Sequence, residues 1–257
     1  MTLKRLLGLG LLAWLLAGCA STGNEGQAAP LRVGVMPDYP PIVYRQQGSV
    51  SGLEADFARQ LAEDLHRPLE FHQYALADLF DALDKGQIDI IMSGISITPA
   101  RSQRYLFSEP YATIGQMAMI RQDDAMRLAV PGALRSGRYP VGYKFGTTGE
   151  QFVKQQVNGQ TRGFNSNTEA IQALMDGDID FYVHDAPTVW NLSNRTEYPV
   201  KLLGLYKPLT EERLAWVMRQ GDFQLQQQVN DALQGWRDNG FLRQEKLHWI
   251  PVKILSR

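Results

Sequence analysis

The chain has 257 residues, with 26 Lys and Arg against 27 Asp and Glu and a single Cys, so its formal net charge is −1. This balance excludes broad electrostatic binding to nucleic acid, which needs a basic surface. The single Cys excludes an intramolecular disulfide framework and a Cys-cluster metal site. A hydrophobic content of 44% lets the chain bury a sizeable core. The sequence after the N-terminus contains no apolar span of about 20 residues, so it predicts no internal membrane helix.

The first 18 residues have the pattern of a leader segment that is removed from the mature protein. Lys4 and Arg5 precede an apolar run at 6–17 that is too short for a comfortable membrane span. The run ends in Leu-Ala-Gly followed by Cys19, which resembles the bacterial lipobox. The resemblance implies that residues 1–18 are a lipoprotein signal peptide and that acyl chains on Cys19 anchor the protein to a membrane. The alternative is an ordinary secretory signal followed by an incidental Cys.

A short polar segment separates Cys19 from the first predicted strand. Residues 19–30 are small and polar without apolar periodicity, so we expect a flexible tether. Loss of residues 1–18 removes two of the 26 basic residues, and the mature charge becomes 24 − 27 = −3. The body beyond the tether contains no Cys, which suits an oxidising compartment such as the periplasm.

The first half of the body alternates between strand and helix patterns. Apolar runs at 31–36, 68–74 and 88–92 predict buried strands. Between them, residues 52–65 carry apolar side chains four positions apart, as on one face of a helix, and 78–84 also has a helical pattern. This β-α-β-α-β order predicts an α/β fold with a mainly parallel sheet flanked by helices.

The same pattern recurs later in the chain. Residues 82–90 align with 173–181 and match at five of nine positions, each segment combining a helix end, a glycine and a strand. The alternative explanation is chance, or the residue preferences that any helix followed by a strand would share. The repeat predicts a second α/β lobe, with a first strand at 140–143 and a first helix at 149–157.

The C-terminal segment has no counterpart in the second lobe. A strand pattern at 213–218 precedes an amphipathic helix at 223–239. We therefore expect the chain to return to the first lobe and to cross between the lobes twice, near 111–115 and 209–213. The predicted division is given by three ranges: 31–112 plus 211–257 for lobe 1, and 113–210 for lobe 2.

Polar segments follow three of the predicted strands, where ligands of parallel sheets bind. They are 93–101, 144–149 and 184–187. Arg101 can pair with a carboxylate, the helix start at 147–149 favours an anion, and Asp185 can accept from an ammonium group. Together they predict a receptor for a zwitterion, although each has a plain alternative: Arg101 as a surface residue, and Thr147 or Asp185 as a helix cap.

These segments resemble the family 3 periplasmic solute-binding proteins, the receptors of polar amino-acid ABC importers. The matching motifs are residues 90–101, 107–111, 52–65, 144–147 and 183–187, and the resemblance extends from Leu31 to Trp249. It implies a two-lobed type II periplasmic-binding-protein-like fold with two hinge crossings. It also implies a cleft that closes around its ligand by hinge bending.

The resemblance assigns roles to individual positions. Arg101 would pair with the ligand α-carboxylate, assisted by the hydroxyl and backbone N–H of Ser96 and the N–H of Thr147. The Gly94 carbonyl and the Asp185 carboxylate would take the α-ammonium group.

Further positions would surround the ligand side chain. Tyr39 corresponds to an aromatic wall, whereas Leu76 stands where many receptors carry a second aromatic. Lys144 and His184 match positions that approach the side-chain amide in glutamine-binding members. The complete candidate set is Tyr39, Leu76, Ser93, Gly94, Ser96, Arg101, Lys144, Thr147, Thr148, His184 and Asp185.

Two positions bear on the charge of the ligand. Met36 stands where receptors for cationic amino acids carry an Asp, and Lys144 adds positive charge, so the sequence argues against a Lys- or Arg-like ligand. A polar, acidic or modestly apolar side chain fits better, although Asp38 could restore negative charge.

The resulting hypothesis is a periplasmic, lipid-anchored, monomeric receptor that passes an amino acid or related carboxylate to an ABC permease, without catalysis, cofactor, metal or nucleic acid. One alternative is a cyclohexadienyl or arogenate dehydratase-like lyase on the same fold, with Asp185, Glu150 or His184 as the acid. Another is a ligand-sensing module without transport.

Overall fold

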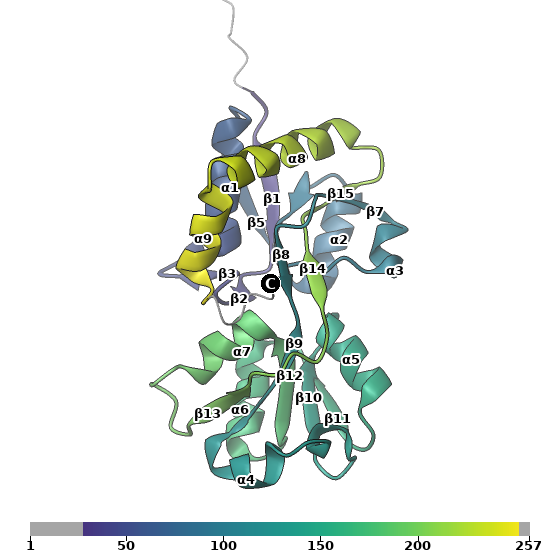
Figure 1. The fold of residues 1–257 in the computed structure, drawn as a ribbon. Helices are drawn as coiled ribbons and strands as arrows, with labels where there is room; N and C mark the ends of the chain where they lie inside the picture. The colour runs from purple at the N-terminus through teal and green to yellow at the C-terminus, as the bar shows by residue number, and fades with distance from the viewer. Residues whose placement is uncertain (1–27, 252–257) are drawn as a thin grey trace, which may run out of the picture.

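Two five-stranded sheets form the centres of two lobes in the computed structural model, which describes residues 28–251 (Figure 1). The predicted signal peptide, the lipidation site at Cys19 and most of the predicted tether lie outside the described residues. The two-lobed α/β fold predicted from the sequence is confirmed.

Lobe 1 contains the first sheet, in the order β5-β1-β6-β15-β7, and a small hairpin sheet, β2-β3-β4. The strands are β1 (Leu31–Val35), β2 (Asp38–Tyr39), β3 (Val43–Gln46), β4 (Ser49–Ser51), β5 (Leu69–Gln73), β6 (Ile90–Ile91), β7 (Tyr105–Phe107) and β15 (Val217–Arg219). The helices are α1 (Leu53–Asp64), α2 (Leu76–Asp84), α3 (Pro99–Ser102), α8 (Phe223–Asp238) and α9 (Phe241–Trp249).

Lobe 2 contains the second sheet, in the order β11-β10-β12-β9-β13. The strands are β9 (Gln116–Arg121), β10 (Val141–Lys144), β11 (Thr161–Phe164), β12 (Phe181–Asp185) and β13 (Leu202–Leu205). The helices are α4 (Ala125–Leu128), α5 (Thr148–Gln156), α6 (Asn167–Asp176) and α7 (Ala186–Ser193), with short 3₁₀ turns at Gln122–Asp124 and Ala133–Arg135.

Both sheets are mainly parallel, as the sequence predicted, and each contains one strand that runs against the other four. Three neighbouring strands in each sheet are parallel, and the fourth strand, β15 or β9, pairs antiparallel with the neighbours on both of its sides. In each sheet, the antiparallel strand is the one that directly follows a crossing between the lobes: β9 follows β8, and β15 follows β14. Apolar runs indicate that a strand is buried but not its direction, so the predicted strand at 213–218, which overlaps β15, had no direction assigned, and no strand was predicted at β9.

Two short strands carry the chain between the lobes. β8 (Ala112–Ile114) links β7 to β9, β14 (Glu212–Leu214) links β13 to β15, and the two pair antiparallel in the middle of the molecule (Figure 1). The predicted strand at 213–218 is therefore divided between a crossing and a sheet. At this point a Cβ on Gly115 would lie 2.1 Å from the carbonyl oxygen of Thr210, so the crossing needs a residue without a side chain.

The apolar face predicted for the helix at residues 52–65 packs into the core of the first lobe. Phe57 of α1 is fully buried and lies within ring-contact distance of Tyr111, Trp216, Trp236 and Phe241. Because Trp216 follows β14 and Trp236 lies on α8, this cluster attaches the C-terminal segment to the N-terminal lobe. Burial of such large rings contributes strongly to stability.

The internal repeat appears in the structure as a repeated contact. In each lobe an Arg on the antiparallel strand donates hydrogen bonds to two carbonyl oxygens around the repeated helix-to-strand turn. The acceptors are Leu83 and Ile88 for Arg219, and the aligned residues Leu174 and Ile179 for Arg121. The matching residues at 82–90 and 173–181 therefore build equivalent turns.

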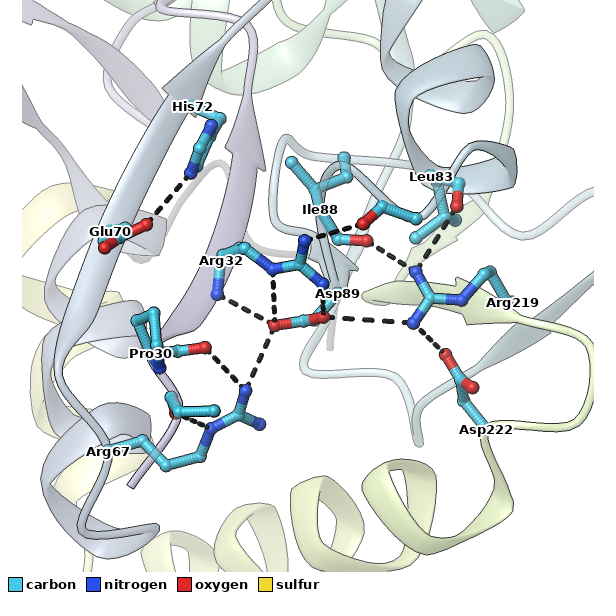
Figure 2. Close-up of polar contacts among 12 residues, drawn as sticks. Pro30, Arg32, Arg67, Glu70, His72, Leu83, Ile88, Asp89, Arg219 and Asp222 are labelled. Atoms are coloured by element: carbon cyan, nitrogen blue, oxygen red, sulfur yellow. Dashed lines mark hydrogen bonds and ion pairs between the residues drawn. The ribbon is translucent and has the colours of Figure 1, made fainter. Parts of the chain in front are cut away.

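Three arginines converge on Asp89, a residue of this repeat that directly precedes β6 in the first sheet (Figure 2). Asp89 accepts from the side chains of Arg32 and Arg67 and forms an ion pair with Arg219. Arg67 also donates to the carbonyl of Pro30 at 2.6 Å. Burial by itself would raise the pKa of Asp89, but the hydrogen bonds and charge of Arg32 outweigh it and hold that pKa below 3.8.

We expect Asp89→Ala to lower the free energy of unfolding by about 2–3 kcal/mol, because it leaves three partly buried arginines and the Arg32 backbone N–H without their acceptor. Urea unfolding at pH 7 measures this. Asp81→Ala is the control: its carboxylate is 71% exposed and 4.0 Å from Lys85, and its loss should change stability by less than about 0.5 kcal/mol. Equal effects of the two substitutions would contradict this interpretation.

Candidate functional site

A small cavity lies between the lobes, beyond the carboxyl ends of the parallel strands. Ten of the eleven candidate residues line it, and Lys144 does not. The lining residues are Met36, Tyr39, Leu76, Ser93, Gly94, Ile95, Ser96, Arg101, Thr147, Thr148, His184 and Asp185. They come from both lobes, so a ligand in this cavity would contact both at once.

Arg101 lies in α3, the short helix that follows β6 along the chain. Thr98 caps the short helix α3 by accepting the Arg101 backbone N–H at 3.3 Å. The guanidinium donates to the carbonyl of Ser96 in its own lobe at 3.0 Å and to that of Gly146 in the other lobe at 3.2 Å. It also lies 5.6 Å from the centre of the Phe80 ring. These contacts fix a cation at the boundary between the lobes.

Asp185 ends β12 and is buried. Its carboxylate accepts hydrogen bonds from the Tyr39 hydroxyl, across the cleft, and from the side-chain amide of Gln116. Burial raises the pKa of Asp185 to about 7, and the negative charge of Glu212 adds to this effect, while Tyr39, Gln116 and Arg101 oppose it. A cationic group in the cavity would reverse the shift.

Glu212 is central to the site and was not predicted. Its carboxylate accepts hydrogen bonds from the hydroxyls of Ser96 (2.6 Å), Thr148 (2.6 Å) and Thr210 (2.7 Å), and from the amide of Gln116 (3.1 Å). These donors come from lobe 1, lobe 2 and the crossing. Sequence reasoning looked for polar residues after parallel strands, whereas Glu212 begins a crossing strand, and nothing in its local sequence marks it.

The helix start at 147–149 combines a cap with a contact to the crossing. The Thr147 hydroxyl accepts the Glu150 backbone N–H at 3.2 Å, so Thr147 is the N-cap of α5. It also donates to the carbonyl of Lys144 at 2.7 Å. The Thr147 hydroxyl is thus used by the cap, and the Thr148 hydroxyl donates to Glu212. The groups that this turn can offer a ligand are therefore its backbone N–H groups.

The amine of Lys144 is used in a contact between the lobes. It is buried and lies 2.7 Å from the Asp38 carboxylate. Asp38 also accepts the Asn167 backbone N–H at 3.1 Å, and the Asn167 side chain donates to the Asp38 carbonyl at 2.6 Å. Asp38 and Lys144 therefore balance each other's charge at this edge of the cleft.

The loop after β6 rests on a buried carboxyl group. Glu54 accepts the Gly94 backbone N–H at 2.7 Å and the Trp216 indole N–H at 3.1 Å. Burial raises the pKa of Glu54 to about 7. A Cβ on Gly94 would lie 2.2 Å from the Tyr39 ring, so only glycine fits here. The Ser93 hydroxyl accepts the Met36 backbone N–H at 2.8 Å, which ties this loop to the end of β1.

The cleft is closed in this structure. Contacts between the lobes join Tyr39 to Asp185, Asp38 to Lys144, and the Thr188 hydroxyl to the carbonyl of Pro40 at 3.1 Å. A guanidinium and a carboxylate that face one closed cavity complement a small zwitterion. Among residues 28–251, no three His, Cys, Asp or Glu side chains are grouped to hold a metal ion, and no helix is long and apolar enough to cross a membrane.

Three larger hollows on the surface are weaker candidates. One lies between α1 and α8 and contains only acidic charges, Asp64 and Asp231, and another lies on lobe 2 and contains only basic ones, Arg135 and Lys207. The third contains charges of both signs but lies on lobe 1 alone, and its two arginines already donate to Asp56, Asp89 and backbone carbonyls. The small cavity between the lobes is therefore the better candidate for a zwitterion site.

The comparisons with known proteins agree with this geometry. The family model of bacterial extracellular solute-binding proteins, family 3, matches residues 31–252. The L-cystine-binding protein TcyJ of Escherichia coli K12 is 26% identical over 226 residues, which cover 87% of this chain and 84% of that protein. The amino-acid-binding protein AabA of Dichelobacter nodosus is 27% identical over 220 residues, covering 84% and 85%.

Solved structures of binding proteins share the fold. The ancestral amino acid-binding protein AncCDT-1, described as a precursor of cyclohexadienyl dehydratase, is 31% identical with a TM-score of 0.78 and covers 86% of this chain and 95% of its own. A putative ABC-transporter binding component from Wolinella succinogenes, complexed with lysine, is 26% identical with a TM-score of 0.81, covering 87% and 97%. The chain thus belongs to the bacterial extracellular solute-binding proteins of family 3.

Proposed function

We propose that this protein binds an amino acid, or a closely related small zwitterion, between its lobes and delivers it to an ABC importer. The observation that carries the proposal is the pair of opposite charges, Arg101 and Asp185, that two different lobes contribute to one cavity. Relatives named for binding cystine, histidine, arginine and glutamine support an amino-acid ligand.

In this proposal, each end of the zwitterion has its own partners. The carboxylate pairs with Arg101 and the backbone N–H groups of Ser96 and Thr147. The ammonium group binds the Asp185 carboxylate and the Gly94 carbonyl. A fixed guanidinium gives bidentate recognition of a carboxylate. Burial raises the pKa of Asp185 to about 7, and an ammonium group beside it would favour its carboxylate form.

Closure of the cleft would couple binding to delivery. The two lobes would move relative to each other about β8 and β14. Lobe 1 would comprise residues 31–112 and 211–257, and lobe 2 would comprise residues 113–210. A ligand that contacts both lobes shifts the population towards the closed form, and the permease would recognise that form.

The attachment to the cell is a further part of the proposal. The lipobox-like sequence before Cys19 supports cleavage at that point and a lipid anchor that holds a periplasmic receptor on a bacterial membrane. We expect this receptor to be a monomer. Mass spectrometry of the protein from its membrane fraction would test this: a mature N-terminus at Cys19 with acyl mass supports it, whereas an unmodified Cys19 opposes it.

A thermal-shift screen of the purified protein against the L-amino acids tests the binding function. A specific ligand should raise the melting temperature by mass action. Absence of any shift would oppose the proposal, and turnover of prephenate or arogenate by the same protein would favour a lyase instead. A permease and an ATPase encoded beside the protein would support import over sensing.

The Asp38–Lys144 pair should contribute to ligand affinity although it lies outside the cavity lining. We expect Lys144→Met to weaken binding about tenfold, because it removes a partly buried ion pair that forms between closed lobes. Asp38→Asn combined with Lys144→Met should be less harmful than the product of the single effects, as titration calorimetry can measure. Lys85→Met, in an exposed pair on lobe 1, is the control, and strictly multiplicative effects of the two substitutions would contradict the coupling.

A further inference from the structure

Glu212 lies where the second crossing passes from one lobe to the other. β14 runs beside β8 between the lobes (Figure 1), and the residues that follow Glu212 pair with lobe 1. The Ile97 backbone N–H donates to the Arg213 carbonyl at 2.9 Å, and the Ala215 N–H donates to the Ile95 carbonyl at 3.0 Å.

The residues that precede Glu212 pair with lobe 2 instead. The Leu209 backbone N–H donates to the Gln116 carbonyl at 2.8 Å, and the Gln116 N–H donates to the Thr210 hydroxyl at 2.9 Å. The backbone therefore changes its partner lobe between Thr210 and Arg213, and Glu212 stands at this change.

The Glu212 carboxylate joins side chains from both lobes. Its Oε2 accepts from the Ser96 hydroxyl of lobe 1 at 2.6 Å and from the Thr148 hydroxyl of lobe 2 at 2.6 Å. Its Oε1 accepts from the Thr210 hydroxyl at 2.7 Å and from the Gln116 amide at 3.1 Å. One carboxylate oxygen thus holds a hydroxyl of each lobe, while the other is tied to the start of the crossing and to β9.

The two contacts of Oε2 depend differently on the position of the lobes. Ser96 is fastened to β14 by its backbone bridge to Leu214, so its hydroxyl stays near Glu212 when the lobes separate. Thr148 is the first residue of α5, which packs against β10 in lobe 2. Opening about β8 and β14 would therefore remove Thr148 from Glu212 and leave Ser96 in place.

The contact between Glu212 and Thr148 is strong enough to affect the balance between open and closed forms. A hydrogen bond to a carboxylate is stronger than one between neutral groups. Both side chains are half-buried, so water can replace the missing partner in the open form and the net gain is modest. We expect it to favour closure about tenfold.

We propose that Glu212 is a positioning residue for closure, which fastens Thr148 of lobe 2 to the crossing and to Ser96 of lobe 1. This inference rests on the proposed function for its ligand, whereas the closure itself can be measured on the ligand-free chain. It also assigns the Ser96 hydroxyl to Glu212 rather than to the ligand carboxylate that the family resemblance implies.

Single-molecule fluorescence energy transfer without ligand measures the ratio of closed to open molecules. The dyes are attached at Asp81→Cys on lobe 1 and Arg162→Cys on lobe 2, both exposed positions, in a chain in which Cys19→Ser removes its own single Cys. Glu212→Ala should shift the ratio about tenfold towards the open form.

A neighbouring residue supplies the matched control. Glu211→Ala removes the same charge from an exposed position beside Glu212, and it should leave the ratio unchanged. Melting temperatures identify any loss of folding. An unchanged ratio in folded Glu212→Ala, or an equal shift in Glu211→Ala, would overturn the inference. A failure of all amino acids to bind would contradict the proposed function instead, and this measurement would still stand.

Thr148→Val tests the contact itself, because it removes the hydroxyl but keeps the shape of the side chain and the backbone N–H. It should shift the ratio about tenfold in the unmodified chain and less than about twofold in Glu212→Ala. Equal shifts in the two backgrounds would overturn the inference.

Affinity separates a role in closure from a direct contact with the ligand. Calorimetry with the best amino acid of the screen should show that Glu212→Ala loses no more affinity than the shift in the ratio accounts for. A clearly larger loss would place Glu212 among the ligand contacts and overturn the positioning role.

Discussion

Arg101→Ala is expected to weaken binding of the amino-acid ligand at least about a hundredfold, the largest effect of any single substitution in the cavity. Two hydrogen bonds between a guanidinium and a carboxylate contribute about 1.5–3 kcal/mol each when the site is desolvated. Arg101→Lys should not restore affinity, because an ammonium group cannot reproduce the bidentate geometry. Titration calorimetry measures both variants.

The fold should survive this substitution. Arg101 contacts its surroundings through two backbone carbonyls and lies in a four-residue helix, so the melting temperature without ligand should change little. Arg104→Ala is the matched control, since Arg104 is 68% exposed and pairs with Asp84 at the surface. Unchanged binding in Arg101→Ala would contradict the assignment of the carboxylate to this residue.

Ligand binding is expected to release a proton from Asp185 near neutral pH. The pKa of Asp185 is raised to about 7, first by burial and then by the charge of Glu212, so part of the ligand-free protein carries a protonated Asp185. An ammonium group beside Asp185 favours the carboxylate and lowers its pKa. Affinity should therefore rise between about pH 5 and pH 7, by up to about tenfold per unit, and level off above pH 7.

The sign of this effect distinguishes it from a change in stability. A carboxyl group whose folded pKa lies above 3.8 binds more protons in the folded state, so its contribution to the free energy of unfolding falls as pH rises from about 4 to 7. The ligand-free protein should lose stability over the range in which ligand binding gains affinity. Calorimetry in buffers of different ionisation enthalpy counts the released protons.

Two variants identify the group that releases the proton. Asp185→Asn should bind weakly and without a pH dependence between pH 5 and 7. Glu54 is another buried acid whose pKa is raised to about 7, and it supports Gly94 from behind the cavity. Glu54→Gln should keep the proton release, and a release that disappears with Glu54 instead of Asp185 would contradict the account.

Much of the cavity could be predicted because its residues follow strands in recognisable local patterns. Arg101 and Asp185 each stand shortly after a buried apolar run, and the repeat of 82–90 at 173–181 indicated two similar lobes. Parallel strands bring such residues to the same edge of a sheet. The family resemblance then selected individual residues, ten of which line the cavity.

The rest depends on contacts between distant segments. Glu212 meets Ser96 and Thr148 only because β14 crosses between the lobes, and no local pattern encodes that meeting. Similarly, the sequence alone gives Lys144 no partner, whereas the fold places an Asp38 carboxylate oxygen 2.7 Å from its amine nitrogen. The antiparallel direction of β15 was not predicted for the same reason, since strand direction is set by the neighbours in the sheet, and β9 was not predicted as a strand.

The most direct test of the central claim compares the best amino acid of the screen with two of its own analogues, one lacking the α-carboxylate and one lacking the α-ammonium group. Arg101 and Asp185 line the cavity from different lobes, and the proposed function assigns one of these groups to each of them, so calorimetry should show that each analogue loses at least about a hundredfold in affinity. An analogue without its ammonium or carboxylate group that binds as tightly as the amino acid would contradict the zwitterion receptor.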